Sequence, residues 1–136
     1  MKLKTFTLLS TLIFLGAILA GCKPDPNEEF IQGVWFYNDE HLQNLPAESH
    51  LTDQWLFDRG TFQRATCCFV TANYTGNYRT LESKEDRLRL ELYNLKGDIG
   101  NTSLSSKELL EITIIIHADE DTLKIDRAEP YLRMTP

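Results

Sequence analysis

Apolar side chains recur at every second residue along much of this chain. In the segment 88–93 leucines alternate with Arg89 and Glu91, and the segment 110–116 repeats the pattern with leucine and isoleucine. Because successive side chains of a strand point to opposite faces, a period of two predicts half-buried β-strands. Shorter runs predict the remaining strands. Eight are expected, over residues 31–37, 51–57, 61–69, 74–81, 88–93, 110–116, 123–126 and 131–134.

The segments between these strands are short and polar, which favours antiparallel neighbours. Asp58-Arg59-Gly60 ends in a glycine suited to a left-handed conformation, and residues 83–86 and 119–121 are similarly short. Parallel strands need longer, usually helical, crossovers, and no long helical period appears. Strands with one apolar face form a sandwich or a barrel, and closure removes exposed edges. We therefore predict an all-β fold, a single antiparallel up-and-down β-barrel of about eight strands.

The inward faces given by this alternation are almost exclusively leucine and isoleucine. Such side chains either fill a barrel or line it for a small apolar ligand, and none of them can transfer a proton. Both alternatives remain open at this stage. The side chains expected to face a ligand are those of Leu88, Leu90, Leu92, Leu110, Ile112, Ile114 and Ile116.

The first 21 residues have the layout of a secretory signal. Lys2 and Lys4 precede an uncharged apolar run over residues 6–20, which is shorter than the roughly 20 residues that cross a bilayer as a helix. The run ends in Leu-Ala-Gly-Cys22, which resembles the lipobox of bacterial lipoproteins. This resemblance implies cleavage before Cys22 and acylation of its thiol and new amino group. The alternative is an ordinary signal followed by a chance cysteine.

Residues 22–29 are expected to form the lipidated cysteine and a tether, because they combine two prolines with charges that favour an extended, solvated chain. Residues 30–136 then form the barrel domain. Without residues 1–21 the chain has a net charge of −8, which argues against binding nucleic acid and against lying flat on anionic lipid. In the bacterial lipoproteins that the Cys22 motif resembles, an aspartate after the cysteine signals inner-membrane retention, so this resemblance, with Lys23 at that position, implies the outer membrane of the cell envelope. Which face of that membrane carries the protein is left open.

Three short motifs resemble those of lipocalins and of small lipocalin-like bacterial domains of the calycin type. They are Phe30-Ile31-Gln32-Gly33-Val34-Trp35, the hairpin WLFDRGTF at 55–62, and Gly76-Asn77-Tyr78. The resemblance implies that Trp35, next to Gly33, plugs the closed end of the barrel. It also implies that an arginine near the last strand, Arg133 or Arg127, packs over this ring.

The polar candidates do not form a recognisable catalytic or metal site. His41 and His50 lie among carboxylates, but an eight-residue gap containing a proline fixes no zinc geometry. His117 is expected to cap a strand, and residues 119–121 lack the spacing of a calcium loop. HExxH, GxSxG, P-loop and Ser-x-x-Lys patterns are missing from the sequence. We expect no metal, no cofactor and no enzymatic activity.

Cys67 and Cys68 are the only other cysteines and are expected in an oxidising compartment. Adjacent residues of a regular strand point to opposite faces, so a disulfide between them would need a break in the strand. The odd separation of Phe62 and Phe69 indicates such a change of phase, because both can face the core only if a bulge intervenes. A vicinal disulfide, two reduced thiols, and intermolecular bonding or metal binding all remain open.

Two functions follow from these predictions. The first is a membrane-anchored lipoprotein with a lipocalin-like domain that binds a small apolar ligand. The second is a protein–protein module of the envelope, an inhibitor or assembly factor with a filled barrel, which recognises its partner through loops 38–50 and 96–107.

Overall fold

One antiparallel sheet that closes on itself makes up nearly all of the structure. The computed structural model describes residues 23–37, 52–67, 71–126 and 130–134, without the side chain of Cys67. The strands among these residues are β1 (Gly33–Tyr37), β2 (Thr52–Asp58), β3 (Thr61–Cys67), β4 (Ala72–Lys84), β5 (Arg87–Ile99), β6 (Thr102–Ser103), β7 (Leu110–His117), β8 (Thr122–Ile125) and β9 (Tyr131–Arg133). Two short helical segments, α2 (Pro26–Phe30) and the 3₁₀ turn η3 (Ala118–Glu120), accompany them.

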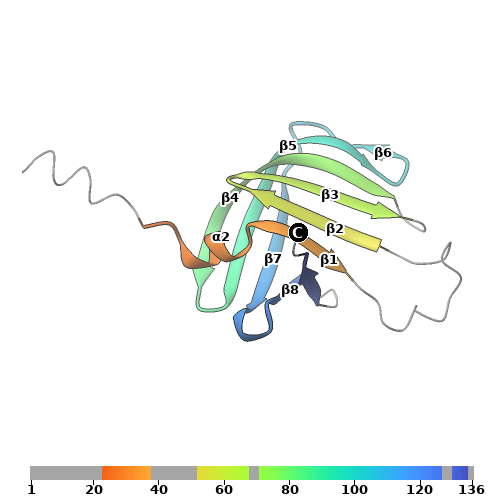
Figure 1. Ribbon diagram of the computed structural model, residues 1–136. Coiled ribbons are helices and arrows are strands. Elements are labelled where there is room, and N and C mark those ends of the chain that lie inside the picture. The colour runs from red at the N-terminus through yellow and green to blue at the C-terminus, as the bar shows by residue number, and fades with distance from the viewer. Residues whose placement is uncertain (1–22, 38–51, 68–70, 127–129, 135–136) are drawn as a thin grey trace, which may run out of the picture.

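The ring contains eight strands in the order β1, β2, β3, β4, β5, β7, β8, β9 (Figure 1). Each pairs with the next in an antiparallel sense, and β9 pairs back with β1 through Trp35↔Arg133 to Tyr37↔Tyr131. Among the described residues β6 pairs with β5 alone and extends the sheet outside the ring. The predicted antiparallel up-and-down barrel is confirmed.

All eight predicted strands are present, but β4 and β5 are longer than their alternation indicated. Each has 13 residues, and their pairing contains register shifts between Thr75 and Asn77 and between Thr80 and Glu82. A bulge of this kind exchanges odd- and even-numbered residues on the inward face, so an alternation with a period of two does not continue through it. Because β5 continues to Ile99 and turns into β6, part of the predicted loop 96–107 is a hairpin.

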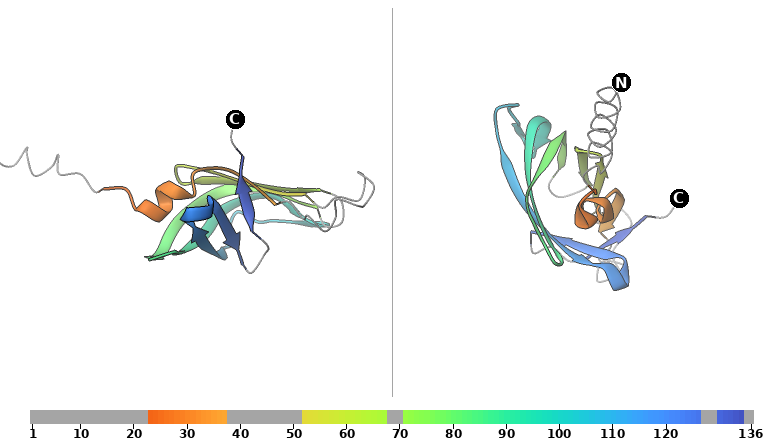
Figure 2. Two further views of the ribbon diagram at one scale, coloured as in Figure 1. Left: turned by 60° about the horizontal axis from the view of Figure 1, so that its bottom comes forward. Right: turned by 90° about the vertical axis from the view of Figure 1, so that its left-hand side faces the viewer.

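The barrel has two distinct ends. Helix α2, the β2–β3 turn, the β4–β5 turn and η3 lie at one end, which we call the closed end. Figure 2 shows the strands curving around α2 when the molecule is seen from this side. The opposite end, where β1 ends at Tyr37 and where β2, β4 and β9 begin, is called the distal end.

Helix α2 was not expected, since residues 22–29 were predicted to be an extended tether. Asp25 is its N-cap, and the Asp25 Oδ1 accepts hydrogen bonds from the N–H groups of Asn27 (2.8 Å) and Glu28 (3.2 Å). Pro26 stands in the first turn, where a missing N–H costs nothing. The same Asp25 oxygen also accepts from Ser83 Oγ (2.9 Å) on β4. The helix therefore belongs to the folded domain.

The core is a single cluster of buried side chains with an aliphatic and an aromatic wall. The aliphatic wall lies on β5, β7 and β8. It contains Leu88, Leu90, Leu92, Ile112, Ile114, Ile116, Leu123 and Ile125. The aromatic wall lies on β2, β3 and β4 and contains Trp55, Phe57, Phe62, Tyr74 and Tyr78. Neighbouring rings in it are 5.6 to 6.3 Å apart, most of them tilted or edge-on, as aromatic pairs prefer.

The pairing of β4 with β5 closes the ring and depends on the absence of a side chain at Gly97. This residue has φ +127° and lies opposite Tyr74, where a Cβ would collide with the carbonyl oxygen of Asn73. We expect Gly97→Ala to lower the free energy of unfolding by about 3 kcal/mol or more, from backbone strain and overpacking. Gly100→Ala is the matched control. Nothing stands within 4 Å of its added Cβ, so its left-handed φ alone should cost about 1 kcal/mol. Urea unfolding measures both, and equal losses would contradict this account.

Candidate functional site

The closed end is sealed by Arg133, whose guanidinium lies over Trp35 at 4.2 Å from the ring centroid. It donates to the carbonyl oxygens of Gln32 (2.7 Å) and Phe30 (2.8 Å), which lie at the end of α2 and just after it. Gly33 has φ +113° and its Cα lies near Arg133. The Trp35 indole donates to the Ile31 carbonyl (2.7 Å). Arg133 thus takes the position considered for it above, and Arg127 lies outside the described residues.

The seven predicted ligand-facing side chains are packed against one another and against the aromatic wall. Leu88, Leu90, Leu92, Ile112, Ile114 and Ile116 are buried members of the core, and Leu110 is partly buried against it. Four hollows lined by described residues are open to solvent, and Ile116 is the one residue of this set that lines any of them. Within the described structure this stripe serves as core.

The inward faces predicted from the alternation did not include the distal end, where the structure places two charged side chains inside the barrel. Asp53 shares the inward face of β2 with Trp55 and Phe57, and it is 7% exposed. Arg64 shares the inward face of β3 with Phe62. The inward assignment had rested on the leucine- and isoleucine-rich strands, which supply only one wall of the barrel.

Asp53 is the acceptor at the centre of this group. Its carboxylate receives both Nε (3.1 Å) and Nη2 (2.8 Å) of Arg64 in a bidentate pair, and it also receives the Tyr131 hydroxyl (2.8 Å). Bidentate, charge-assisted pairs of this kind are the stronger class of hydrogen bond. β2, β3 and β9 are thereby joined across the interior, although β9 and β2 are not neighbours in the sheet.

A row of three side chains on neighbouring strands surrounds this pair. Trp55, Arg64 and Tyr74 stand directly opposite one another on β2, β3 and β4. The Arg64 guanidinium lies 5.0 Å from the centroid of the Trp55 ring, and its Nη1 donates to the Tyr74 hydroxyl (3.4 Å). The Arg64 side chain keeps 29% of its surface exposed. We refer to Asp53, Trp55, Arg64, Tyr74 and Tyr131 as the distal cluster.

Two residues of the distal cluster, Arg64 and Tyr131, have raised pKa values. Burial acts to lower the pKa of Arg64, but hydrogen bonds and charge from Asp53 and Tyr74 outweigh it and raise that pKa above its ordinary value. Burial and then the Asp53 carboxylate raise the pKa of Tyr131 well above its ordinary value. At neutral pH Arg64 therefore stays cationic and Tyr131 stays protonated. The cluster offers fixed hydrogen-bond donors, which suit binding better than proton transfer.

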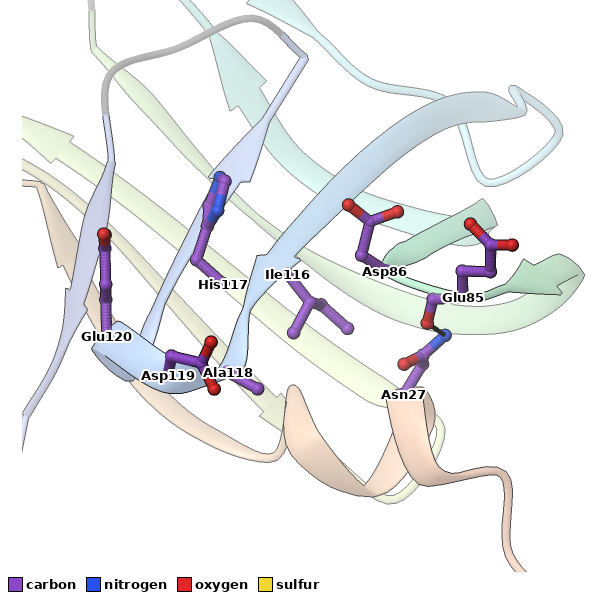
Figure 3. Close-up of a pocket in the computed structure, with 8 residues that line it drawn as sticks. All are labelled: Asn27, Glu85, Asp86, Ile116, His117, Ala118, Asp119 and Glu120. Carbon is purple, nitrogen blue, oxygen red and sulfur yellow. Dashed lines mark hydrogen bonds between the residues drawn. The ribbon is translucent and has the colours of Figure 1, made fainter.

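One of the four hollows, of about 350 Å³, lies at the closed end. Figure 3 shows Asn27 of α2 and Glu85 and Asp86 of the β4–β5 turn facing the end of β7 and η3 across it. The Asn27 amide donates to the Glu85 carbonyl (3.0 Å). The acidic side chains around this hollow are exposed, and within the described ranges no three His, Cys, Asp or Glu side chains are placed to hold a metal. The hollow is therefore a solvated acidic surface at the closed end.

Several residues singled out from the sequence lie outside the described residues. These are Cys22, Cys68, His41 and His50, and the side chain of Cys67. The β2–β3 pairing runs without a shift from Asp58↔Thr61 to Thr52↔Cys67. The change of phase expected between Phe62 and Phe69 is thus not found as far as Cys67, where β3 ends. His117 is the last residue of β7, and its Nε2 is buried without a hydrogen-bond partner.

A signal for the distal cluster was available in the sequence. Asp53 has the same parity as Trp55 and Phe57, and Arg64 the same parity as Phe62, which places both polar groups on faces that carry large aromatic rings. An acid and a base on the inward faces of two strands joined by a two-residue turn could be expected to pair. The partner Tyr131 could not be found this way, because it comes from the opposite end of the chain.

Comparisons with protein-family models, with curated proteins and with solved structures found no match to this chain.

The Asp53–Arg64 pair gives a test of what the distal cluster contributes to stability. Asp53→Ala leaves a half-buried cation and the Tyr131 hydroxyl without their acceptor, and it should lower the free energy of unfolding by about 2 kcal/mol. Replacing both partners, Asp53→Leu with Arg64→Met, should return stability close to that of the natural chain, because apolar substitutes of similar size often match a buried ion pair. Glu111→Ala, in the exposed pair with Arg89, is the control and should change little. A double variant as unstable as the single one would show that the pair itself stabilises the fold.

Proposed function

We propose that this chain is a lipid-anchored protein of the bacterial cell envelope whose lipocalin-like barrel binds a small, mainly apolar ligand at its distal end. The observation that carries the proposal is the distal cluster. A barrel that only needed a core could fill this space with leucine, as it does on the opposite wall. An ion pair inside a protein often contributes little net stability. The presence of this pair among aromatic rings is therefore better explained by a role in ligand recognition.

Because the interior is packed, we place the site near the distal end, where Arg64 is accessible, and not in a deep calyx. The aliphatic wall is buried and packed, with Leu88, Leu90, Leu92 and Ile114 fully shielded from solvent. Arg64 is the accessible member of the inward row. A ligand would lie against the Trp55–Arg64–Tyr74 row, with aromatic surface for its apolar part and donors for a polar group.

The anchor is proposed from the N-terminal sequence, and the structure of α2 is compatible with it. Cys22 precedes the N-cap Asp25 by only two residues, Lys23 and Pro24. Several acyl chains on one cysteine hold a protein on a membrane without a spanning segment, at about 0.8 kcal/mol per buried CH₂. In the ranges that the structure describes, no helix is both long and apolar enough to cross a bilayer.

A second candidate, a protein–protein module of the envelope, is favoured by an apolar patch on the outside of the barrel. Leu132 and Met134 are 46% and 52% exposed, and half-buried Val34, Phe36 and Leu56 lie beside them on β1 and β2. Apolar patches on an otherwise acidic surface often mark protein contacts. A filled barrel would use this wall and the rim loops for recognition, and it would carry no guest.

The anchor is tested by intact mass measurement of the protein made in a diderm bacterium. We expect a mature chain that begins at Cys22 and carries the added mass of a diacylglyceryl group and an N-terminal acyl chain. Cys22→Ala should abolish the added mass and release the protein from the membrane fraction, because no other anchor is proposed. Cys67→Ala is the control and should leave both unchanged. A mature chain that starts elsewhere without lipid would refute the anchor.

Ligand binding is tested by native mass spectrometry of the same protein purified under mild conditions. We expect a population with the added mass of one small molecule, which is lost in the Asp53→Leu/Arg64→Met double variant because the distal cluster is gone. Glu111→Ala should retain the guest. Preparations from several growth conditions that never carry extra mass would count against a ligand and favour the second candidate.

A further inference from the structure

The distal cluster contains more hydrogen-bond donors than acceptors. A guanidinium has five N–H groups, and three of those of Arg64 are used by Asp53 and Tyr74. The Tyr74 hydroxyl accepts from Arg64, and its own proton has no acceptor among the described residues. The buried Trp55 Nε1–H lies beside the Tyr131 hydroxyl, whose oxygen can accept from it. Donors of Arg64 and Tyr74 therefore have no protein partner among the described residues.

The main acceptor of the cluster is already engaged. The two Asp53 oxygens receive three hydrogen bonds from Arg64 and Tyr131. A buried donor without a partner costs free energy, and Tyr74 is only 4% exposed. These donors would be satisfied by a ligand group that has hydrogen-bond acceptors and no donors.

The charges of Asp53 and Arg64 restrict which ligand acceptor can bind here. Asp53 and Arg64 neutralise each other through a bidentate pair at 3.1 and 2.8 Å. A carboxylate or phosphate on a ligand would place a second negative charge beside Asp53, in a chain that already has a net charge of −6. Like charges this close disfavour each other in a partly dry site. A neutral acceptor meets the same donors without this penalty.

Resting on the proposed ligand site, we infer that the ligand has a neutral carbonyl-type acceptor, such as a ketone, ester or amide oxygen, joined to a flat apolar body. The acceptor meets Arg64 Nη1 and the Tyr74 hydroxyl, which are 3.4 Å apart and can donate to one oxygen. The flat body lies against the accessible side of the Arg64 guanidinium, next to the Trp55 ring, and it reaches Tyr74 only when side chains that keep these rings 1 to 4% exposed move aside. Tyr74 is the specificity-determining residue of this arrangement.

Three probes of one shape test the inference by titration calorimetry with the full mature protein in detergent micelles, using empty micelles as the reference. They are 2-acetylnaphthalene with a neutral acceptor, 2-naphthoate with a charged acceptor, and 2-ethylnaphthalene with no acceptor. The ketone should bind at least about tenfold more tightly than the hydrocarbon and about fivefold more tightly than the carboxylate.

Tyr74→Phe keeps the ring and removes the donor. It should weaken ketone binding about fivefold while leaving hydrocarbon binding unchanged. Tyr78→Phe is the matched control, because it removes a hydroxyl four residues along the same inward face of β4 that is bonded to Gln32 at the closed end. It should leave both affinities unchanged. Thermal unfolding of both variants identifies any loss of fold.

The outcomes separate this inference from the proposed function. Equal binding of ketone and hydrocarbon, or tightest binding of the carboxylate, would overturn the neutral-acceptor inference while the ligand site stands. Equal effects of Tyr74→Phe and Tyr78→Phe would also overturn it. Failure of all three probes to bind, in a protein that carries no guest from cells, would overturn the inference and the ligand site together.

Discussion

The guanidinium of Arg133 is the interaction on which the closed end depends. It covers the Trp35 ring at 4.2 Å, holds the carbonyl oxygens of Phe30 and Gln32, and donates to the Asp121 carboxylate (2.8 Å) after η3. Arg133 itself lies on β9, whose pairing with β1 joins the two ends of the chain. Arg133 therefore links the β1–β9 pairing, the Trp35 ring in the core and the end of α2. Backbone carbonyls that would otherwise be orphaned at the end of a helix receive donors here.

The sequence predicted the architecture because alternation and turn chemistry are local. The Arg59-Gly60 turn, with both residues at positive φ, is a two-residue hairpin of the kind that glycine indicates. Helix α2 was missed because a single turn has no detectable period, although its cap Asp25 and Pro26 were a signal. The distal cluster was only partly predictable, since parity places Asp53 and Arg64 inside but Tyr131 joins them from 78 residues away. Tertiary contacts of that range leave no local pattern.

The two walls of the interior have different physical roles. The aliphatic wall stabilises the fold through burial, since side chains such as Leu90 and Ile114 are fully shielded and carry no polar atoms. The aromatic wall includes hydroxyl and indole groups that need partners, and it surrounds the Asp53–Arg64 pair. Polar networks inside a protein are costly when they are incomplete. An incomplete network at one end of an otherwise well-packed barrel is consistent with the ligand site proposed there.

Helix α2 and the distal cluster lie at opposite ends of the barrel, and the proposed anchor precedes α2 in the chain. Asn27 donates to Ser83 Oγ and to the Glu85 carbonyl, both at 3.0 Å, so the helix is held against the β4–β5 turn. Two residues between Cys22 and Asp25 reach only about 10 Å when extended. A lipid on Cys22 would therefore hold the closed end near the bilayer and turn the distal end toward the aqueous side. A ligand would then reach Arg64 from water, which fits a molecule with a neutral polar group better than one that partitions wholly into lipid.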